Sequence, residues 1–135
     1  MSFERSELAV RVYYEDTDSS GRVYHGSYLR FLERGRTEWL RGRGFSHSDL
    51  AASSGIAFAV RSMQIDFLAP ARIDDLLCVE TSAPTARGAS IEFRQRVLLG
   101  EKTLVAATVL VVAIRNGHPA RLPAALREAL ARPSL

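Results

Sequence analysis

The sequence predicts an α+β fold in which one long helix is wrapped by a five-stranded antiparallel sheet. Three observations support this prediction. One long segment carries apolar residues at helical spacing, five shorter segments are patterned as strands, and glycines separate the last strands where hairpin turns are needed. A chain of 135 residues is long enough to bury a core of its own, and we expect one domain spanning residues 1–135.

The first strand is predicted at residues 8–14, where Leu8, Val10 and Val12 fall on one face. Residues 16–21 follow as a turn, because they are rich in residue types that prefer loops. The chain should therefore leave the sheet just before the long helix begins.

The long helix is predicted at residues 25–41. Its apolar positions recur every three or four residues and form a stripe that should face the core: Tyr28, Phe31, Leu32, Gly35 and Trp39. Gly35 is unusual there, because a glycine in a helix interior costs about 0.5–1 kcal/mol relative to alanine. We expect this glycine to let another backbone segment approach the helix closely.

The rest of the chain is predicted to be mainly strands. Gly42 and Gly44 end the helix, and a helical turn follows at residues 46–54 with Ser46 or Ser48 as its cap. Four strands, paired as antiparallel hairpins, are expected at residues 57–69, 76–82, 89–99 and 103–114. The last of them is nearly all apolar, as expected of a strand buried on both faces. A short amphipathic helix is predicted at residues 123–132.

Composition argues against several classes of protein. The net charge is +3, and the basic residues are scattered rather than gathered into the basic face typical of nucleic-acid binding. A single cysteine, Cys78, excludes a disulfide within the chain and a multi-cysteine zinc site. The three histidines show no ligand spacing, so no metal or other cofactor is expected: His25, His47 and His118.

Hydropathy predicts a cytoplasmic protein. The longest apolar run, residues 103–114, is shorter than the roughly 20 residues that a membrane span needs. Glu4, Arg5 and Glu7 interrupt the first ten residues, unlike a signal peptide.

The turn before the long helix carries the strongest indication of catalysis. It holds Asp16 and Asp18, in the turn that leads into the predicted helix. The N–H groups of a first helical turn have no partners within the helix, so they can hold a developing oxyanion. A carboxylate facing them can act on an acyl carbonyl as a general base or as a nucleophile. Asp18 also fits a plain turn or cap residue, and Asp16 is expected to face solvent or to cap the turn.

Two neighbours of these aspartates are further candidates. His25 lies at the positive end of the helix, where an imidazolium is disfavoured, so we expect a neutral ring. It could position water, hydrogen-bond Asp18, contribute only its backbone N–H, or be purely structural. Tyr14 is expected to pack as an aromatic, with its hydroxyl reaching the site.

Several motifs, in their order and spacing, resemble the hotdog-fold acyl-CoA thioesterases. They cover nearly the whole chain and run from VYYEDTD (12–18), VYH (23–25), YL (28–29), ER (33–34) and RTE (36–38) to FAVR (58–61), APAR (69–72), DD (74–75) and LP (122–123). The resemblance is closest to the YbgC branch, which in many Gram-negative bacteria is associated with the Tol–Pal envelope system. It is more distant to 4-hydroxybenzoyl-CoA thioesterase.

The resemblance implies an acyl-CoA thioesterase with a hotdog fold. It also implies a homodimer that shares a continuous sheet, often a homotetramer, with active sites at the dimer interface. It assigns the catalytic carboxylate to Asp18 and the oxyanion-binding N–H to Tyr24 or His25. Tyr14 and His25 also fall on positions linked to catalysis. Arg22 is a departure, since a small apolar residue is more usual beside the site.

The same resemblance implies that coenzyme A is bound through arginines and backbone groups. Arg87 is the candidate that the resemblance indicates, and Arg61 and Arg72 are further candidates. Two alternative functions stay open at this point. One is a hotdog hydratase or dehydratase in which Asp18 and His25 work as an acid/base pair. The other is a non-catalytic protein that binds acyl-carrier protein or envelope partners linked to Tol–Pal.

Overall fold

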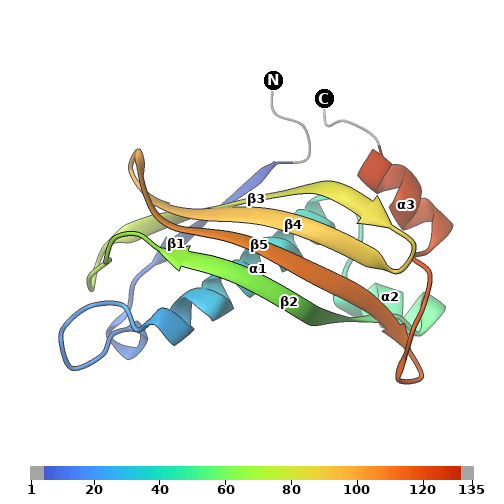
Figure 1. The fold of residues 1–135 in the computed structure, drawn as a ribbon, viewed down its shortest axis with the longest axis horizontal. Helices are drawn as coiled ribbons and strands as arrows, with labels where there is room; N and C mark the ends of the chain where they lie inside the picture. The colour runs from blue at the N-terminus through green and yellow to red at the C-terminus, as the bar shows by residue number, and fades with distance from the viewer. Residues whose placement is uncertain (1–4, 132–135) are drawn as a thin grey trace.

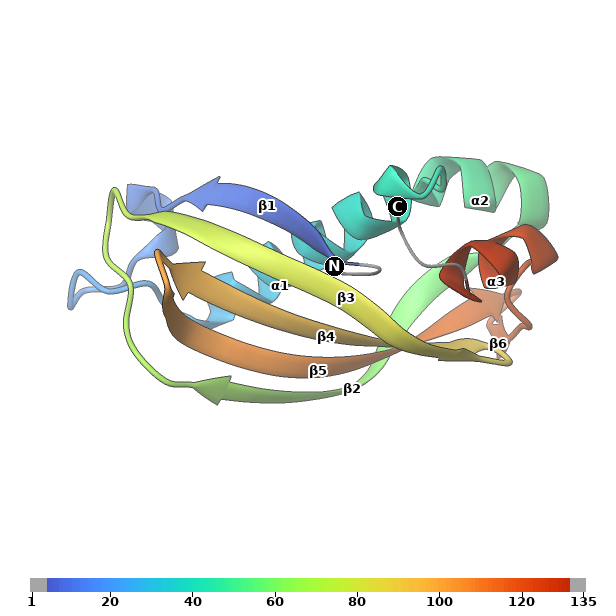
Figure 2. The same ribbon diagram turned by 90° about the horizontal axis from the view of Figure 1, so that it is seen from above.

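The computed structural model describes residues 5–131, which form a curved antiparallel sheet with one long helix lying across one face (Figures 1 and 2). The strands are β1 (Ser6–Arg11), β2 (Ala57–Phe67), β3 (Leu76–Arg87), β4 (Ser90–Leu99), β5 (Lys102–Arg115) and β6 (His118–Pro119). The helices are a short 3-10 turn η1 (Tyr14–Asp16), then α1 (His25–Gly42), α2 (His47–Ser54) and α3 (Ala124–Ala131). The predicted α+β class is confirmed, and the two-residue β6 extends the predicted five strands to six.

The order of the strands corrects the hairpin prediction in one place. The sheet runs β1-β3-β4-β5-β2, with β6 paired to β5. Strands β3, β4 and β5 are consecutive antiparallel hairpins as predicted, but β2 pairs with β5 and not with β3. The connection between β2 and β3, residues 68–75, is too long for a tight turn. It carries the chain from the β2 edge across the sheet toward the opposite edge, where β3 lies beside β1 (Figure 2). As a result β2 is an edge strand.

The first strand ends earlier than predicted. Strand β1 stops at Arg11, although Val10 and Val12 are buried on one face as expected. Tyr14 begins the 3-10 turn instead of continuing the strand. The turn is held because the Asp16 carboxylate accepts the N–H of Tyr13 at 2.8 Å and the Asp16 N–H donates to the Tyr13 carbonyl at 3.0 Å.

Helix α1 buries the predicted stripe against the sheet. Tyr28, Phe31, Leu32, Gly35 and Trp39 are all buried, and Trp39 meets Phe93 of β4 edge to face at 5.5 Å between ring centroids. These side chains join the inner faces of β3, β4 and β5 in one core. The buried face of α1 also includes Ser27, Arg36 and Leu40.

Gly35 allows a close approach, as predicted, but to side chains and not to a backbone segment. A Cβ at this position would lie 2.7 Å from both Thr81 Oγ1 and Val79 Cγ1, and 3.0 Å from Gln95 Nε2. Because these groups lie on the inner face of the sheet, the missing side chain sets how near α1 comes to β3 and β4.

The prediction that residues 103–114 are buried on both faces is wrong for this chain by itself. Alternate residues of β5, such as Ala107 and Val109, are buried, but Thr108 between them is exposed. The reason is that no layer of the described residues covers the face of the sheet opposite α1.

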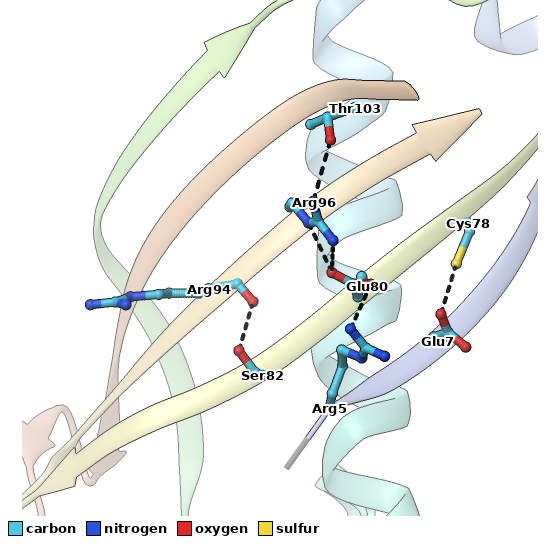
Figure 3. Close-up of polar contacts among 8 residues, drawn as sticks. All are labelled: Arg5, Glu7, Cys78, Glu80, Ser82, Arg94, Arg96 and Thr103. Atoms are coloured by element: carbon cyan, nitrogen blue, oxygen red, sulfur yellow. Dashed lines mark hydrogen bonds and ion pairs between the residues drawn. The ribbon is translucent and has the colours of Figure 1, made fainter. Parts of the chain in front are cut away.

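That outer face is polar and holds a network of charges (Figure 3). Glu80 pairs with Arg5 at 3.3 Å and with Arg96 at 2.8 Å, and Arg94 pairs with Glu92 at 3.4 Å. A hollow of about 420 Å³ lies over these strands. It contains none of the site residues predicted from the sequence.

The two short helices follow their predictions closely. Helix α2 is capped by Ser46, whose hydroxyl accepts the N–H of Asp49 at 3.1 Å. Helix α3 buries Leu126, Ala129 and Leu130. The predicted last residue of α3, residue 132, lies outside the described residues.

Candidate active site

The loop between η1 and α1 fixes the position of Asp18. The Asp18 N–H donates to the Arg22 carbonyl at 2.9 Å, and the Gly21 N–H donates to the Asp18 carbonyl at 3.1 Å. Gly21 has a φ of +82°, a left-handed conformation that glycine adopts without strain. The turn is thereby closed within five residues, and Asp18 sits on an ordered loop.

Ser20 holds the carboxylate itself. Its backbone N–H and its hydroxyl both donate to Asp18 Oδ1, at 2.8 and 2.5 Å. These bonds favour the charged form, so the pKa of Asp18 lies below its ordinary value, first because of the Ser20 hydroxyl and then because of the Ser20 N–H. At neutral pH the side chain is therefore a carboxylate with its second oxygen, Oδ2, free of hydrogen bonds from the described residues.

Asp18 and His25 line the same cavity. Its volume is about 420 Å³, and its other walls come from the loop, from Tyr28 of α1 and from the segment that follows β2. Phe67, the last residue of β2, and Leu68, the first residue after it, are large apolar residues that are about half exposed, at 48% and 60%. The cavity thus combines a carboxylate, a helix start and apolar surface.

The start of α1 presents backbone donors without an acceptor among the described residues, at His25 and at Gly26. His25 is the first residue of the helix, and within the described residues no hydrogen bond has its N–H as donor. The N–H of Tyr24, the other predicted oxyanion donor, is instead engaged by the carbonyl of Asp16 at 2.9 Å. The His25 ring contacts two aromatic rings, that of Tyr24 in a tilted arrangement at 4.8 Å and that of Phe67 by an edge at 5.6 Å, measured between ring centroids.

Asp16 anchors the loop and does not face solvent. Only 7% of it is exposed. Its carboxylate caps Tyr13, as described above, and pairs with Arg30 of α1 at 3.5 Å, while its carbonyl binds Tyr24. The capping half of the prediction for Asp16 is right, and the solvent-facing half is wrong because Arg30 compensates the buried charge.

Two of the predicted residues stand apart from the cavity in this chain. Tyr14 is 82% exposed and is not among the residues that line it. Arg87 ends β3, at the opposite end of the sheet from the loop, where it lines a separate hollow of about 160 Å³ (Figure 1).

The other two arginines differ in their distance from the loop. The backbone of Arg72 forms an antiparallel bridge with that of Arg22, so Arg72 lies at the Asp18 end of the sheet. Arg61 lies within β2, at the register shift between Val60 and Ser62. Of the three arginines expected to bind coenzyme A, only Arg72 is next to the loop.

Three contributors to the site were not predicted from the sequence: Ser20, Phe67 and Leu68. Ser20 could have been found, because a serine two residues after an aspartate in a turn often hydrogen-bonds it. Phe67 and Leu68 could not, since only the pairing of β2 at the edge beside β5 brings them to a loop more than forty residues away.

The described residues contain no cluster of three or more His, Cys, Asp or Glu side chains that could hold a metal ion. Within residues 5–131 there is also no helix that is both long and apolar enough to cross a membrane.

Comparisons with known proteins give a consistent result. The family model of the thioesterase superfamily matches residues 20–106. The acyl-CoA thioester hydrolase YbgC of Escherichia coli O157:H7 is 51% identical over 106 residues, which are 78% of each chain. The crystal structure of a probable thioesterase from Bartonella henselae superposes with a TM-score of 0.85 at 44% identity, over 88% of this chain and 99% of that one. A 4-hydroxybenzoyl-CoA thioesterase complexed with 4-hydroxybenzoyl-CoA shares the fold, with a TM-score of 0.88 at 21% identity over 95% and 99% of the two chains.

Proposed function

This chain belongs to the thioesterase superfamily, with YbgC acyl-CoA thioesterases among its homologues, and from that premise we propose how it hydrolyses acyl-CoA. The fold is the hotdog fold of that family. The reaction is addition of water to the thioester carbonyl and cleavage of the C–S bond, which yields a carboxylic acid and coenzyme A. The observation that carries the site assignment is the ionised Asp18 in one cavity with the first turn of α1.

In the proposed mechanism the thioester carbonyl oxygen lies at the start of α1. The free N–H of His25 stabilises the negative charge that develops there, aided by the positive end of the helix. We prefer His25 to Tyr24 for this role because the Tyr24 N–H already has an acceptor. The His25 ring orients the attacking water, and Tyr28 and Phe67 hold apolar parts of the acyl group.

Asp18 supplies the base or the nucleophile. As a base, its free oxygen removes a proton from water as the water oxygen bonds to the carbonyl carbon, and the proton passes to the departing sulfur. As a nucleophile, the same oxygen bonds to the carbonyl carbon and the C–S bond breaks, so that coenzyme A leaves as a thiolate and a mixed anhydride remains. Water then hydrolyses the anhydride, which restores the Asp18 carboxylate, releases the carboxylic acid and supplies the proton that the thiolate takes up. Both routes need an ionised Asp18, which the hydrogen bonds from Ser20 favour.

We propose that the working unit is a homodimer joined through β2. This strand is an edge of the sheet, with Val60 and Phe67 about half exposed, so its outer backbone groups can pair with a second copy. Strand β3, which separates Arg87 from the Asp18 end, spans eleven residue steps, or roughly 36 Å at about 3.3 Å each. Coenzyme A bound near Asp18 would therefore contact Arg72 of the same copy of the chain. It would contact Arg87 only from another copy.

Four further features stay predictions that rest on the sequence. They are the homotetramer, the catalytic role of Tyr14 and the coenzyme A-binding role of Arg61, a cytoplasmic location, and partners such as acyl-carrier protein or Tol–Pal components.

Ser20→Ala should shift the pH dependence of the reaction in a defined direction. The substitution removes the largest cause of the lowered Asp18 pKa, so the pKa rises. Because the active form is the carboxylate, present above its pKa, the acid limb of the kcat/KM profile should move to higher pH. A profile measured from pH 3 to 8 checks this. An acid limb that stays in place would show that Asp18 does not control it.

The activity itself is tested by identifying products from a saturated acyl-CoA and from its 2-enoyl counterpart. A thioesterase releases one thiol and one free acid per substrate consumed, from either compound. Conversion of the 2-enoyl compound to a 3-hydroxyacyl-CoA without free thiol would instead establish the hydratase alternative. Binding without turnover of either compound would establish the non-catalytic one.

A further inference from the structure

A second, smaller cavity lies between the later turns of α1 and the first half of β2. It has a volume of about 70 Å³. Phe58, Phe93 and Val111 make its apolar walls, and Arg36, Thr37 and His47 bring polar groups to it. None of the residues assigned above to hydrolysis lines this cavity.

Arg36 is the unusual residue here, because it is charged and only 8% of it is exposed. Its Nη1 donates to Gln95 Oε1 at 3.0 Å. Gln95 is itself held in place, since its Nε2 donates to the Leu32 carbonyl at 2.8 Å and to Thr81 Oγ1 at 2.9 Å. The guanidinium is therefore fixed in orientation, with one of its five N–H donors used in this bond.

The charge of Arg36 has no carboxylate next to it. Five ion pairs are found among the described residues, and Arg36 is in none of them. Glu33 lines the same cavity and its charge acts on Arg36, but it is exposed and beyond ion-pair distance. A buried cation without a paired anion is costly. The remaining donors, beside a cavity with apolar walls, are suited to an anion that enters with an apolar chain.

We propose that Arg36 is a specificity residue that binds a carboxylate at the far end of the acyl chain, so that the preferred substrates are CoA thioesters of dicarboxylic acids. A guanidinium fork matches the two oxygens of a carboxylate, and the small cavity suits a carboxylate better than a larger anion. The phenylalanines and Val111 would surround the methylene groups that precede it. This inference rests on the proposed function and adds the class of acyl group.

The proposed β2 dimer gives the acyl chain a route to Arg36. If two copies of β2 pair antiparallel along their whole length, Phe67 of one copy lies near the Ala57 end of the other, at the strand spacing of about 4.8 Å. Phe67 lines the Asp18 cavity, whereas Phe58, Ala59 and Val60 line the Arg36 cavity. The thioester at Asp18 of one copy would thus lie across the shared strands from Arg36 of the other.

The test compares matched substrates with wild-type enzyme. The mono-CoA thioesters of glutaric, adipic and suberic acids are assayed against valeryl-, hexanoyl- and octanoyl-CoA, by thiol release. At the best chain length we expect kcat/KM for the dicarboxylic substrate to be at least tenfold higher. Hydrolysis of the neutral substrates with no such preference would overturn this inference and leave the proposed function standing. Release of thiol from neither series would overturn both.

Variants separate recognition from a structural role. Arg36→Met should lower kcat/KM at least tenfold for the dicarboxylic substrate and less than threefold for the neutral one, whereas Arg36→Lys should keep part of the preference. Glu33→Gln, which removes a negative charge near Arg36, should increase the preference for the dicarboxylic substrate. Arg34→Met makes the same change as Arg36→Met at an exposed position of α1 and should leave the ratio unchanged. Equal losses on both substrates in Arg36→Met would mean that Arg36 only supports the fold.

Discussion

Asp18→Asn should lower kcat by about a thousandfold, within the range of a lost general base. The amide has the same shape and can still accept the two hydrogen bonds from Ser20, so the loop should keep its conformation. It can neither take a proton from water nor attack the thioester. The steady-state kcat of the purified variant measures the loss. The dissociation constant for coenzyme A, measured by titration calorimetry, should change less than about threefold, because the Asp18 carboxylate acts on the thioester and is not proposed to bind the coenzyme A part of the substrate.

A matched control is available at the same end of the sheet. Asp74 is exposed in the loop after β2 and has a φ of +73°, a conformation that asparagine also tolerates. Asp74→Asn removes one negative charge without touching the cavity and should keep kcat near the wild-type value. If Asp18→Asn were as active as this control, Asp18 could be neither the base nor the nucleophile.

Gly35→Val should destabilise the protein by about 3 kcal/mol. Overpacking a core typically costs about 1–3 kcal/mol, and here the added atoms meet stiff β-branched neighbours at 2.7 Å, Thr81 and Val79. They also crowd Gln95, whose hydrogen bond to the Leu32 carbonyl ties α1 to β4. Urea denaturation at one fixed protein concentration gives the free energy of unfolding, which also depends on concentration if the protein is a dimer.

Gly42→Ala is the control for this substitution. Gly42 is the last residue of α1, and a Cβ there would meet nothing within 4 Å. The change should be neutral or slightly stabilising, because alanine is the better helix former. A Gly35→Val protein as stable as Gly42→Ala would contradict the close packing of α1 on β3 and β4.

The sequence predicted α1 and the loop well because the signals are local. The apolar stripe from Tyr28 to Trp39 shares one helical face, and His25 and Arg41 were predicted as the ends of a helix that the structure places at His25–Gly42. Asp18 and His25 come together because the same short loop carries both. The same helical spacing also places Arg36 on the buried face, four residues after Leu32, although its charge favours the surface.

Features that depend on the order of strands could not be predicted in this way. The edge position of β2 is decided by pairing with β5, about fifty residues later in the chain. That pairing determines which apolar residues reach Asp18, such as Phe67. The pairing of β3 with β1 and β4 places Arg87 at the far end of the sheet. The end of β1 was missed for a local reason, since the bond between Asp16 and Tyr13 outweighs the strand preference of two tyrosines.

We propose that thioester hydrolysis takes place at the cavity that Asp18 and His25 share. The most direct test is thiol release, followed with a thiol-trapping dye, from a panel of acyl-CoA substrates by wild type and Asp18→Asn side by side. We predict turnover by the wild type on part of the panel and almost none by the variant. Folded wild-type protein that releases no thiol from any substrate, or an Asp18→Asn protein that releases thiol at the wild-type rate, would contradict hydrolysis by Asp18 at this cavity.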